Sequence, residues 1–203
     1  MGYNHYWRRP RAIERDAFAA IAEDFRKCVL PLDDLGVLLA GPDGDGLPMI
    51  EHEEIAFNGI RDCNHLHNAE IRIPFPSAEA SGIGSSHDAV AGGWFDGVRI
   101  RCRTCNGDCS YEPFVLERVS SLSRRASMPG KHLRDYCKTA FRPYDLAVQC
   151  ALIIARHHLG HQFAVWSSGS ELHWNDARRF CYVHLGYRLE EFRLDADSDN
   201  PES

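Results

Sequence analysis

The segment PYDLAVQCALIIARHHLG, residues 143–160, restricts the possible fold more than any other part of the chain. Pro143 suits the first position of a helix, Asp145 its first turn, and Gly160 the position just beyond its end. Apolar residues lie on almost every side of this helix, and such a helix is stable in water only when it is buried. We therefore expect a buried helix here.

Residues 11–30 predict an amphipathic helix, which we expect Pro31 to end. Apolar side chains recur there at helical spacing: Ile13, Phe18, Ile21, Phe25 and Cys28. A third helix is predicted at residues 170–186, where Gly186 closes the pattern. About three helices are therefore expected.

Short segments of alternating or β-branched residues predict strands. They lie at residues 3–7, 36–41, 53–59, 97–103, 112–119 and 162–168, with an edge strand at 187–194. In the third of them, Ile55 and Phe57 share one face, and Glu54, Ala56 and Asn58 share the other. Residues 120–134 are interpreted as an exposed basic loop.

Helices that are sparse beside a largely antiparallel sheet indicate an α+β fold. We expect residues 1–58 and 111–193 to form one α+β domain and residues 59–110 to be an inserted metal-binding segment. Periodicity fails in that insertion, and so long an irregular stretch needs something to hold it in place. Residues 194–203 are expected to be an acidic disordered tail.

Charge is concentrated near the end of the chain. The formal net charge is −6, and the last segment, EEFRLDADSDNPES, holds six acids and one arginine. The remainder is nearly neutral, which argues against a broad duplex-binding surface, although a small basic patch for nucleic acid is not excluded. No apolar run is long enough to span a bilayer, and the start lacks the apolar segment of a secretory signal. We expect a cytoplasmic protein without a membrane partner.

Eight cysteines in such a chain are expected to be core thiols and metal ligands rather than disulfides. Cys28, Cys150 and Cys181 lie within helical patterns on or near apolar positions, where a free cysteine behaves as a small hydrophobic residue. These three are assigned to the core.

The segments DCNHLH and RCRTCNGDCSYE carry the strongest chemical signal. Zinc takes four thiolate or imidazole ligands in structural sites, commonly as two close pairs. Our predicted set is Cys63, His65, Cys105 and Cys109, with Gly107 allowing the backbone to turn between the last two. A set of four protein ligands leaves no open position, so the predicted zinc is structural rather than catalytic.

Two further residues could replace a member of this set. Cys102 forms a CxxC spacing with Cys105, and His67 follows His65. Strand alternation places Cys102 with Val98 and Ile100, on the face opposite the neighbouring arginines, and so favours a core position for it. We keep Cys102 and His67 as reserve ligands.

A second candidate site lies at CKTAFRPYD, where Lys138 and Arg142 precede the buried helix. Helix N-termini attract anions, so a phosphate or carboxylate could bind there. The alternative is that Asp145 satisfies the helix end while both cations pair with surface acids. His5, Asn58 and Glu112 are polar residues in or beside apolar strands, and could form the floor of a pocket with acid/base capacity.

Four motifs, MGYNHYW, IAFNG, YEPFVLERV and CKTAFRPYDLAV, resemble a family of small uncharacterised proteins encoded by bacteriophages and prophages. The resemblance spans most of the chain and implies a phage-related origin, but no reaction. Members carry a histidine in a His-Glu-Thr-Phe-like strand, whereas Ser110 and Tyr111 precede Glu112 here. The resemblance raises one set of candidate catalytic residues: His5, Asn58, Glu112, Lys138, Tyr144 and Asp145.

Two functions follow as hypotheses. The first is a zinc-stabilised accessory protein that binds a host or phage macromolecule, most simply a protein; it is favoured by the closed ligand set and by the absence of common nucleophile, phosphate-loop and metalloprotease motifs. The second is a small enzyme or ligand-binding protein for a phosphate-bearing compound. The second hypothesis is supported if one pocket is lined by His5, Asn58, Glu112 and Lys138. It is weakened if these residues are scattered or buried.

Overall fold

The structure, a computed structural model, describes residues 3–72, 102–120 and 132–196. These residues contain three α-helices, α1 (Arg15–Asp34), α4 (Asp145–Leu159) and α5 (Asn175–Leu185), and two short 3₁₀ helices, η2 (Gly160–Gln162) and η3 (Glu171–Trp174). All pairings between their strands are antiparallel. The predicted α+β fold is confirmed.

The described strands form three sheets. The first has the order β8-β1-β9, from His132–Lys138, Asn4–Pro10 and Ala164–Ser167. In the second, β4 (Glu54–Gly59) pairs with β2 (Leu39–Ala40), β3 (Met49–Ile50) and β7 (Phe114–Glu117). The third is a hairpin of β5 (His67–Arg72) and β6 (Cys102–Asn106).

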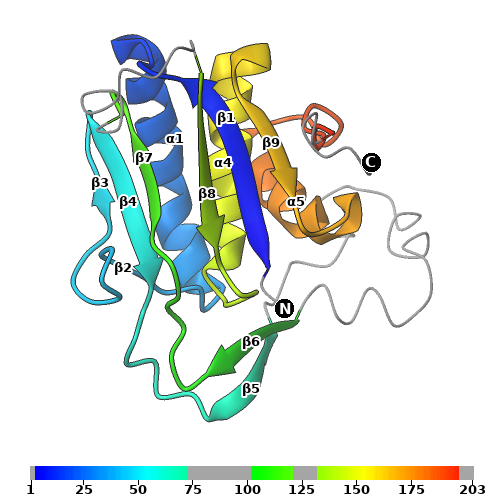
Figure 1. Cartoon of the computed structure of the whole chain (residues 1–203). Helices are drawn as coiled ribbons and strands as arrows, with labels where there is room; N and C mark the ends of the chain where they lie inside the picture. Colours follow the sequence, from blue (N-terminus) through cyan, green and yellow to red (C-terminus); the bar gives the residue numbers. More distant parts are fainter. Residues whose placement is uncertain (1–2, 73–101, 121–131, 197–203) are drawn as a thin grey trace.

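The molecule has two layers, with α1, α4 and α5 on one side of the first two sheets and the β5–β6 hairpin at one end (Figure 1). Helix α4 packs against both α1 and α5. It is buried from Asp145 to Ala155, as its apolar sequence predicted, because helices and sheet enclose it together. The three cysteines assigned to the core, Cys28, Cys150 and Cys181, are buried. Among the described residues, no helix has both the length and the apolar character needed to cross a membrane.

The first helix continues past Pro31, contrary to the prediction that proline ends it. Leu32 belongs to the same buried stripe as Phe25 and Cys28, so continuing the helix buries one more apolar side chain. Termination comes at Gly36, which has φ 77°, and the N–H of Val37 donates to the carbonyl of Leu32. That bond belongs to the usual glycine-terminated end of a helix.

Among the described residues, three strands were not predicted, β3, β5 and β8, and one strand was wrongly predicted. Strand β5 lies in the stretch where periodicity failed, and β8 begins within the predicted basic loop. The outer face of β8 carries charged and aromatic residues, which hides its inward Leu133 and Cys137 from a hydrophobicity pattern. Residues 187–194 form no strand.

Burial on β4 also differs from its predicted alternation. Ala56 and Asn58 are as buried as Ile55 and Phe57, because β4 has paired neighbours on both sides. The predicted tail also starts too early. Asp195 exchanges hydrogen bonds with Val165: its N–H donates to the Val165 carbonyl at 2.7 Å, and its carboxylate accepts the Val165 N–H at 2.8 Å. Residues 197–203 of that tail lie outside the described residues.

Candidate metal centre

Two segments far apart in the sequence meet below the main sheets. Cys63 and His65 lie between β4 and β5, whereas Cys105 lies in β6 and Cys109 follows it. One ligand atom from each of the four lies within 4.8 Å of the other three. The predicted set is therefore brought together, in a form that could hold a metal ion.

Three of the separations are close to those between ligands of a small metal site. The Cys63 and Cys105 sulfurs are 3.4 Å apart, as are those of Cys105 and Cys109, and Nδ1 of His65 lies 3.3 Å from the Cys109 sulfur. A tetrahedral ion with metal–sulfur bonds of ~2.3 Å places its sulfurs ~3.8 Å apart. Small shifts of a few tenths of an ångström would therefore accommodate an ion bound by all four atoms.

Both ligand pairs sit on tight backbone turns. Gly107 has φ 78° between Cys105 and Cys109, as expected from its place in NGD. Asn64 has φ 59° between the other two ligands, a conformation that asparagine adopts more readily than most residues. The Asp108 carboxylate accepts hydrogen bonds from the N–H and the hydroxyl of Ser110, at 2.7 and 2.6 Å, and fixes the exit of the turn.

Gly59 and Asn58 tie this turn to β4. A Cβ at position 59 would lie 2.1 Å from the carbonyl oxygen of Cys109, so only glycine permits this approach. The Asn58 amide donates to the carbonyls of Pro42 and Tyr111, both at 3.0 Å, and its oxygen accepts the N–H groups of Gly59 and Tyr111. Asn58 is thus a buried structural clamp with all its hydrogen bonds made inside the protein.

The thiols would repel one another as thiolates. Burial raises the pKa of Cys109, and the nearby Cys105 and Cys63 raise it further. Burial likewise raises the pKa of Cys105, and Cys63 adds to the rise. A bound cation supplies the positive charge that lets several such thiols ionise together.

The two reserve ligands have different outcomes. His67 begins β5, where it pairs with Asn106, and it is not a member of the cluster. The side chain of Cys102 lies outside the described part of the structure. Among the described side chains, the second pair of ligands is therefore Cys105 and Cys109.

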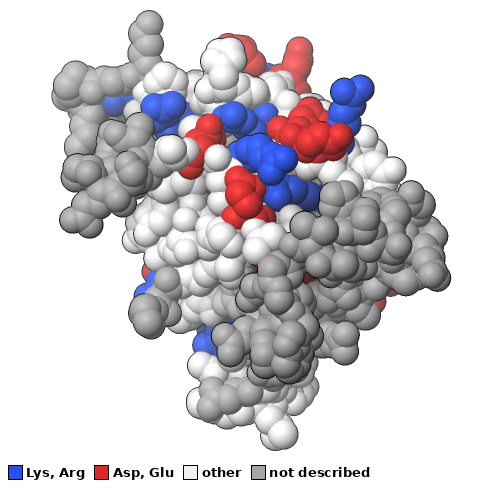
Figure 2. Space-filling model, turned by 90° about the vertical axis from the view of Figure 1, so that its right-hand side faces the viewer, with Lys and Arg blue, Asp and Glu red and all other residues white. Residues whose placement is uncertain are grey.

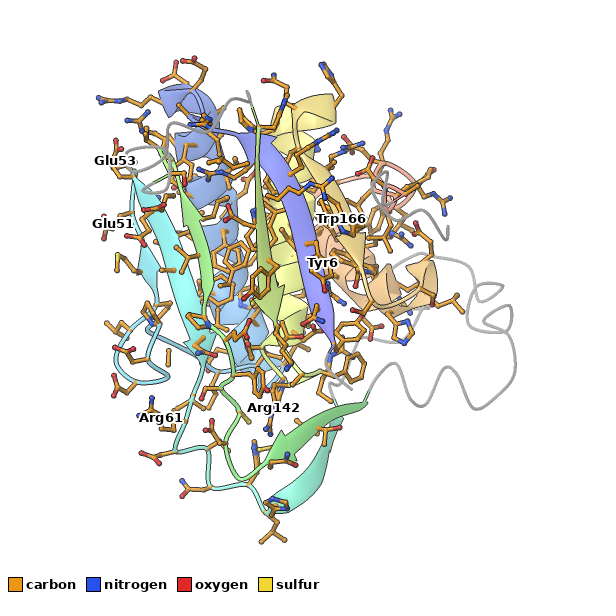
Figure 3. All side chains as sticks on the ribbon, in the orientation of Figure 1. Tyr6, Glu51, Glu53, Arg61, Arg142 and Trp166 are labelled. Atoms are coloured by element: carbon orange, nitrogen blue, oxygen red, sulfur yellow. The ribbon has the colours of Figure 1, made fainter. Side chains whose placement is uncertain are left out.

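Arg142 links the metal loop to the main domain. Its Nη1 donates to the carbonyl of Asp108 at 2.9 Å, and its side chain is 8% exposed. The N–H of Thr104 donates to the carbonyl of Phe141 at 3.0 Å. Figure 3 shows Arg142 above the β5–β6 hairpin. Its role in the predicted anion site stays a prediction.

A buried polar network lies behind the hairpin. Arg103 of β6 has its Nε 3.4 Å from Oδ2 of Asp145, and both side chains are fully buried. The other carboxylate oxygen of Asp145 lies 2.8 Å from Nε2 of His5 and accepts a 2.5 Å hydrogen bond from Thr139. Burial alone would raise the pKa of Asp145, but His5, Arg103 and Thr139 hold it below its ordinary value. Asp145 therefore joins β1, β6 and α4.

Ser167 extends this network. Its Oγ lies 3.1 Å from Nδ1 of His5, so hydroxyl, imidazole and carboxylate stand in the order of an acyl-transfer triad. His5 and Asp145, however, are fully buried. Ser167 also contacts the carbonyl of Asn4 at 3.2 Å and accepts the N–H of Gly169 at 3.1 Å. These bonds inside the protein give the arrangement a structural role.

The remaining candidates, Glu112, Lys138 and Tyr144, lie beside one another. Tyr144 is buried and its hydroxyl donates to the carbonyl of Glu112 at 2.7 Å, while the Glu112 carboxylate accepts the main-chain N–H of Lys138 at 3.0 Å. Glu112 lines a pocket of about 380 Å³ between β7 and β8. Neither His5 nor Asn58 lines it.

Sequence reasoning missed the roles of Arg103 and Ser167. The alternation argument put Arg103 on the arginine-bearing face of its strand, yet it is fully buried. The one available signal was the lone carboxylate of Asp145 in an apolar helix, which a buried cation must balance. No comparable signal marks Ser167.

Comparison of the chain with protein-family models, with curated proteins and with solved structures gave no match.

Proposed function

We propose that the protein is a zinc-stabilised binding module for a macromolecule. The observation that supports this most is the closed set of Cys63, His65, Cys105 and Cys109, which offers four soft ligand atoms to one ion. Three thiols and one imidazole within 4.8 Å of one another suit zinc, and four protein ligands leave no position for a substrate. The ion would hold the hairpin rather than catalyse.

The positions of the polar residues support binding over catalysis. His5, Asn58 and Asp145 make hydrogen bonds inside the protein and are at most 2% exposed. A phosphate-processing enzyme would need such groups to reach a substrate. The resemblance to phage and prophage proteins extends the proposal to a phage or host macromolecule as partner, met in the cytoplasm.

Metal analysis tests the zinc proposal. Protein prepared with zinc present and without chelator should carry about one zinc per chain. A reagent that modifies the cysteine thiols should release this zinc, and a metal indicator dye should detect it. An ion that binds only the folded state stabilises it by ~2.7 kcal/mol at 100 times its dissociation constant. Elemental analysis that finds no zinc, or zinc whose removal leaves the melting temperature unchanged, would reject the proposal.

The alternative, a protein for a phosphate-bearing compound, rests on Lys138 and Arg142 beside the start of α4. A thermal-shift screen with nucleotides and sugar phosphates tests it. A shift that saturates with ligand and disappears in Lys138→Ala would favour this alternative, and no shift with any compound would reject it.

A further inference from the structure

The sheet β8-β1-β9 presents its outer face to solvent, on the side opposite the helices (Figure 1). Side chains alternate along each strand. On β1, His5, Trp7 and Arg9 are buried while Arg8 is exposed, and on β8 Cys137 is buried while Tyr136 is 62% exposed. One face of this sheet is therefore core and the other is surface.

Three aromatic side chains cross this outer face in a row. Tyr6 pairs with Tyr136 on one side and with Trp166 on the other. The rings of Tyr6 and Trp166 are nearly parallel, at 11°, with centroids 6.0 Å apart, and those of Tyr6 and Tyr136 are 6.3 Å apart. Figure 3 shows Tyr6 and Trp166 beside each other on β1 and β9. Large aromatic surfaces in a row on an open sheet face are unusual on a surface that contacts only water.

A second row, of cations, runs parallel to the first. Arg8 and Arg134 are direct cross-strand partners two positions further along their strands, ~7 Å from the aromatic row. The guanidinium of Arg134 lies 5.4 Å from the centre of the Trp166 ring. Both guanidinium groups can bind phosphate oxygens, with which arginine forms strong charge-assisted hydrogen bonds. Lys138 pairs with Asn4 on the other side of the aromatic row.

Acidic side chains are absent from the outward positions of these three strands. The only acid in β1, β8 and β9 is Asp135, which lies on the inward side, 4.0 Å from the buried Arg9. On the side of the helices, Arg178 pairs with Glu171 and Arg156 pairs with Asp195. Figure 2, which views the right-hand side of Figure 1, shows basic and acidic residues side by side there. The outward charged side chains of these three strands are therefore basic, in a chain whose net charge is −6, whereas Glu112, Glu117 and Asp135 line the pocket beside Tyr136.

We propose that this face, made by Tyr6, Tyr136, Trp166, Arg8 and Arg134, binds single-stranded nucleic acid. Bases would stack on the aromatic row, and phosphates would lie along the arginines. Stacking needs unpaired bases, so a duplex, which offers only phosphates here, would bind more weakly. The inference rests on the proposed binding function and names its partner, but it does not depend on the identity of the metal.

The test measures fluorescence anisotropy of labelled strands of about 12 nucleotides, as DNA and as RNA, with a duplex of equal length, on metal-loaded full-length protein. We expect single strands to bind and Trp166→Ala or Tyr136→Ala to weaken that binding about 5- to 150-fold each. Arg8→Gln should lower the slope of log affinity against log salt by about 0.7 between about 50 and 200 mM salt. The DNA and RNA arms identify which strand is preferred.

Matched controls lie in the helix layer. Tyr182→Ala removes an aromatic ring that is 39% exposed on α5, and Arg15→Gln removes an exposed cation at the start of α1. Both should bind like the unaltered protein. Zinc content and the melting transition of each variant show whether it is folded, so a loss of binding in a folded variant is interpretable.

Three results would overturn the inference. They are no single-strand binding by folded protein at about 50 mM salt, binding by Trp166→Ala and Tyr136→Ala as tight as that of the unaltered protein, or self-association that these substitutions abolish. The last result would assign the face to a second copy of the chain. A metal-loaded protein that fails to bind strands leaves the zinc proposal intact. Strand binding by protein that was prepared with zinc present but contains none would reject that proposal and leave this inference standing.

Discussion

Arg103 and Asp145 form a fully buried ion pair, with Nε and Oδ2 3.4 Å apart. Arg103 belongs to the hairpin that carries Cys105, and Asp145 begins the central helix α4. This pair thus joins the candidate metal centre to the core. Several predictions about stability depend on such links between the hairpin and the main domain.

Replacing Arg103 by Met should lower the free energy of unfolding by about 3–5 kcal/mol, because Asp145 would lose a buried cation. Urea denaturation measures this loss. The control is Arg118→Met. Arg118 lies 2.8 Å from the largely exposed carboxylate of Glu53, so its replacement should lower the free energy of unfolding by only about 0–1 kcal/mol. Equal losses for both variants would show that the buried pair has no special role.

Cys63→Ser and Cys105→Ser should each abolish stoichiometric zinc binding and expose residues 59–72 and 102–110 to limited proteolysis. Each change removes one of four ligands and so frees the hairpin from the β4 end. Cys150→Ser, which alters a thiol buried in α4, should keep its zinc. Mass spectrometry of the fragments locates the cuts, and a cleavage pattern unchanged from that of the parent protein would contradict the prediction.

Gly59→Ala should weaken zinc binding and destabilise the fold, since the added carbon would meet the carbonyl of Cys109 at 2.1 Å. Gly36→Ala serves as a control for backbone strain alone, because it also alters a glycine but has no atom within 4 Å of the added carbon. That control should cost roughly 1–2 kcal/mol and leave zinc affinity unchanged. A zinc titration of both variants decides between a steric effect on the loop and a general loss of stability.

Arg142→Ala should lower stability by about 1.5–3 kcal/mol without any ligand, because the guanidinium donates to the Asp108 carbonyl in a buried setting. A cation that served only an anion site would be nearly neutral on removal, and surface changes usually stay within about 0.5 kcal/mol. Thermal unfolding in phosphate-free buffer is the measurement. A loss of stability smaller than about 0.5 kcal/mol would support the anion-site hypothesis.

Asp24 fastens α1 to the end of α4 and to the segment after α5. Its carboxylate lies 2.8 Å from Lys27 and His158, and accepts a 2.7 Å bond from Tyr187. Burial opposes ionisation, but these partners lower the pKa of Asp24 to about 2. A depressed pKa stabilises the fold above the unfolded pKa of about 3.9, and this stabilisation is lost as pH falls through about 2.

Asp24→Asn should therefore be less stable than the parent protein at pH 7, and the difference should shrink between about pH 4 and pH 2. Urea unfolding at several pH values measures both curves. A difference that stays constant down to about pH 2 would mean that the charge of Asp24 contributes nothing.

Local patterns were enough to predict much of this protein. The apolar run of α4 required burial, and the spacing of Cys63, His65, Cys105 and Cys109, with Gly107 between the last two, predicted a metal cluster before any geometry was known. Both are properties of short segments, in which residue type and spacing alone set the conformation or the available ligand atoms.

Only the tertiary structure decided how the other polar residues are used. His5 and Asn58 were predicted to form a pocket floor with Glu112, but long-range contacts make them, like Asp145, buried links. Likewise, Tyr6, Tyr136 and Trp166 become one surface only when β1 pairs with β8 and β9. A sequence specifies its own periodicity, whereas the partner that faces a side chain across a sheet depends on the pairing of distant strands.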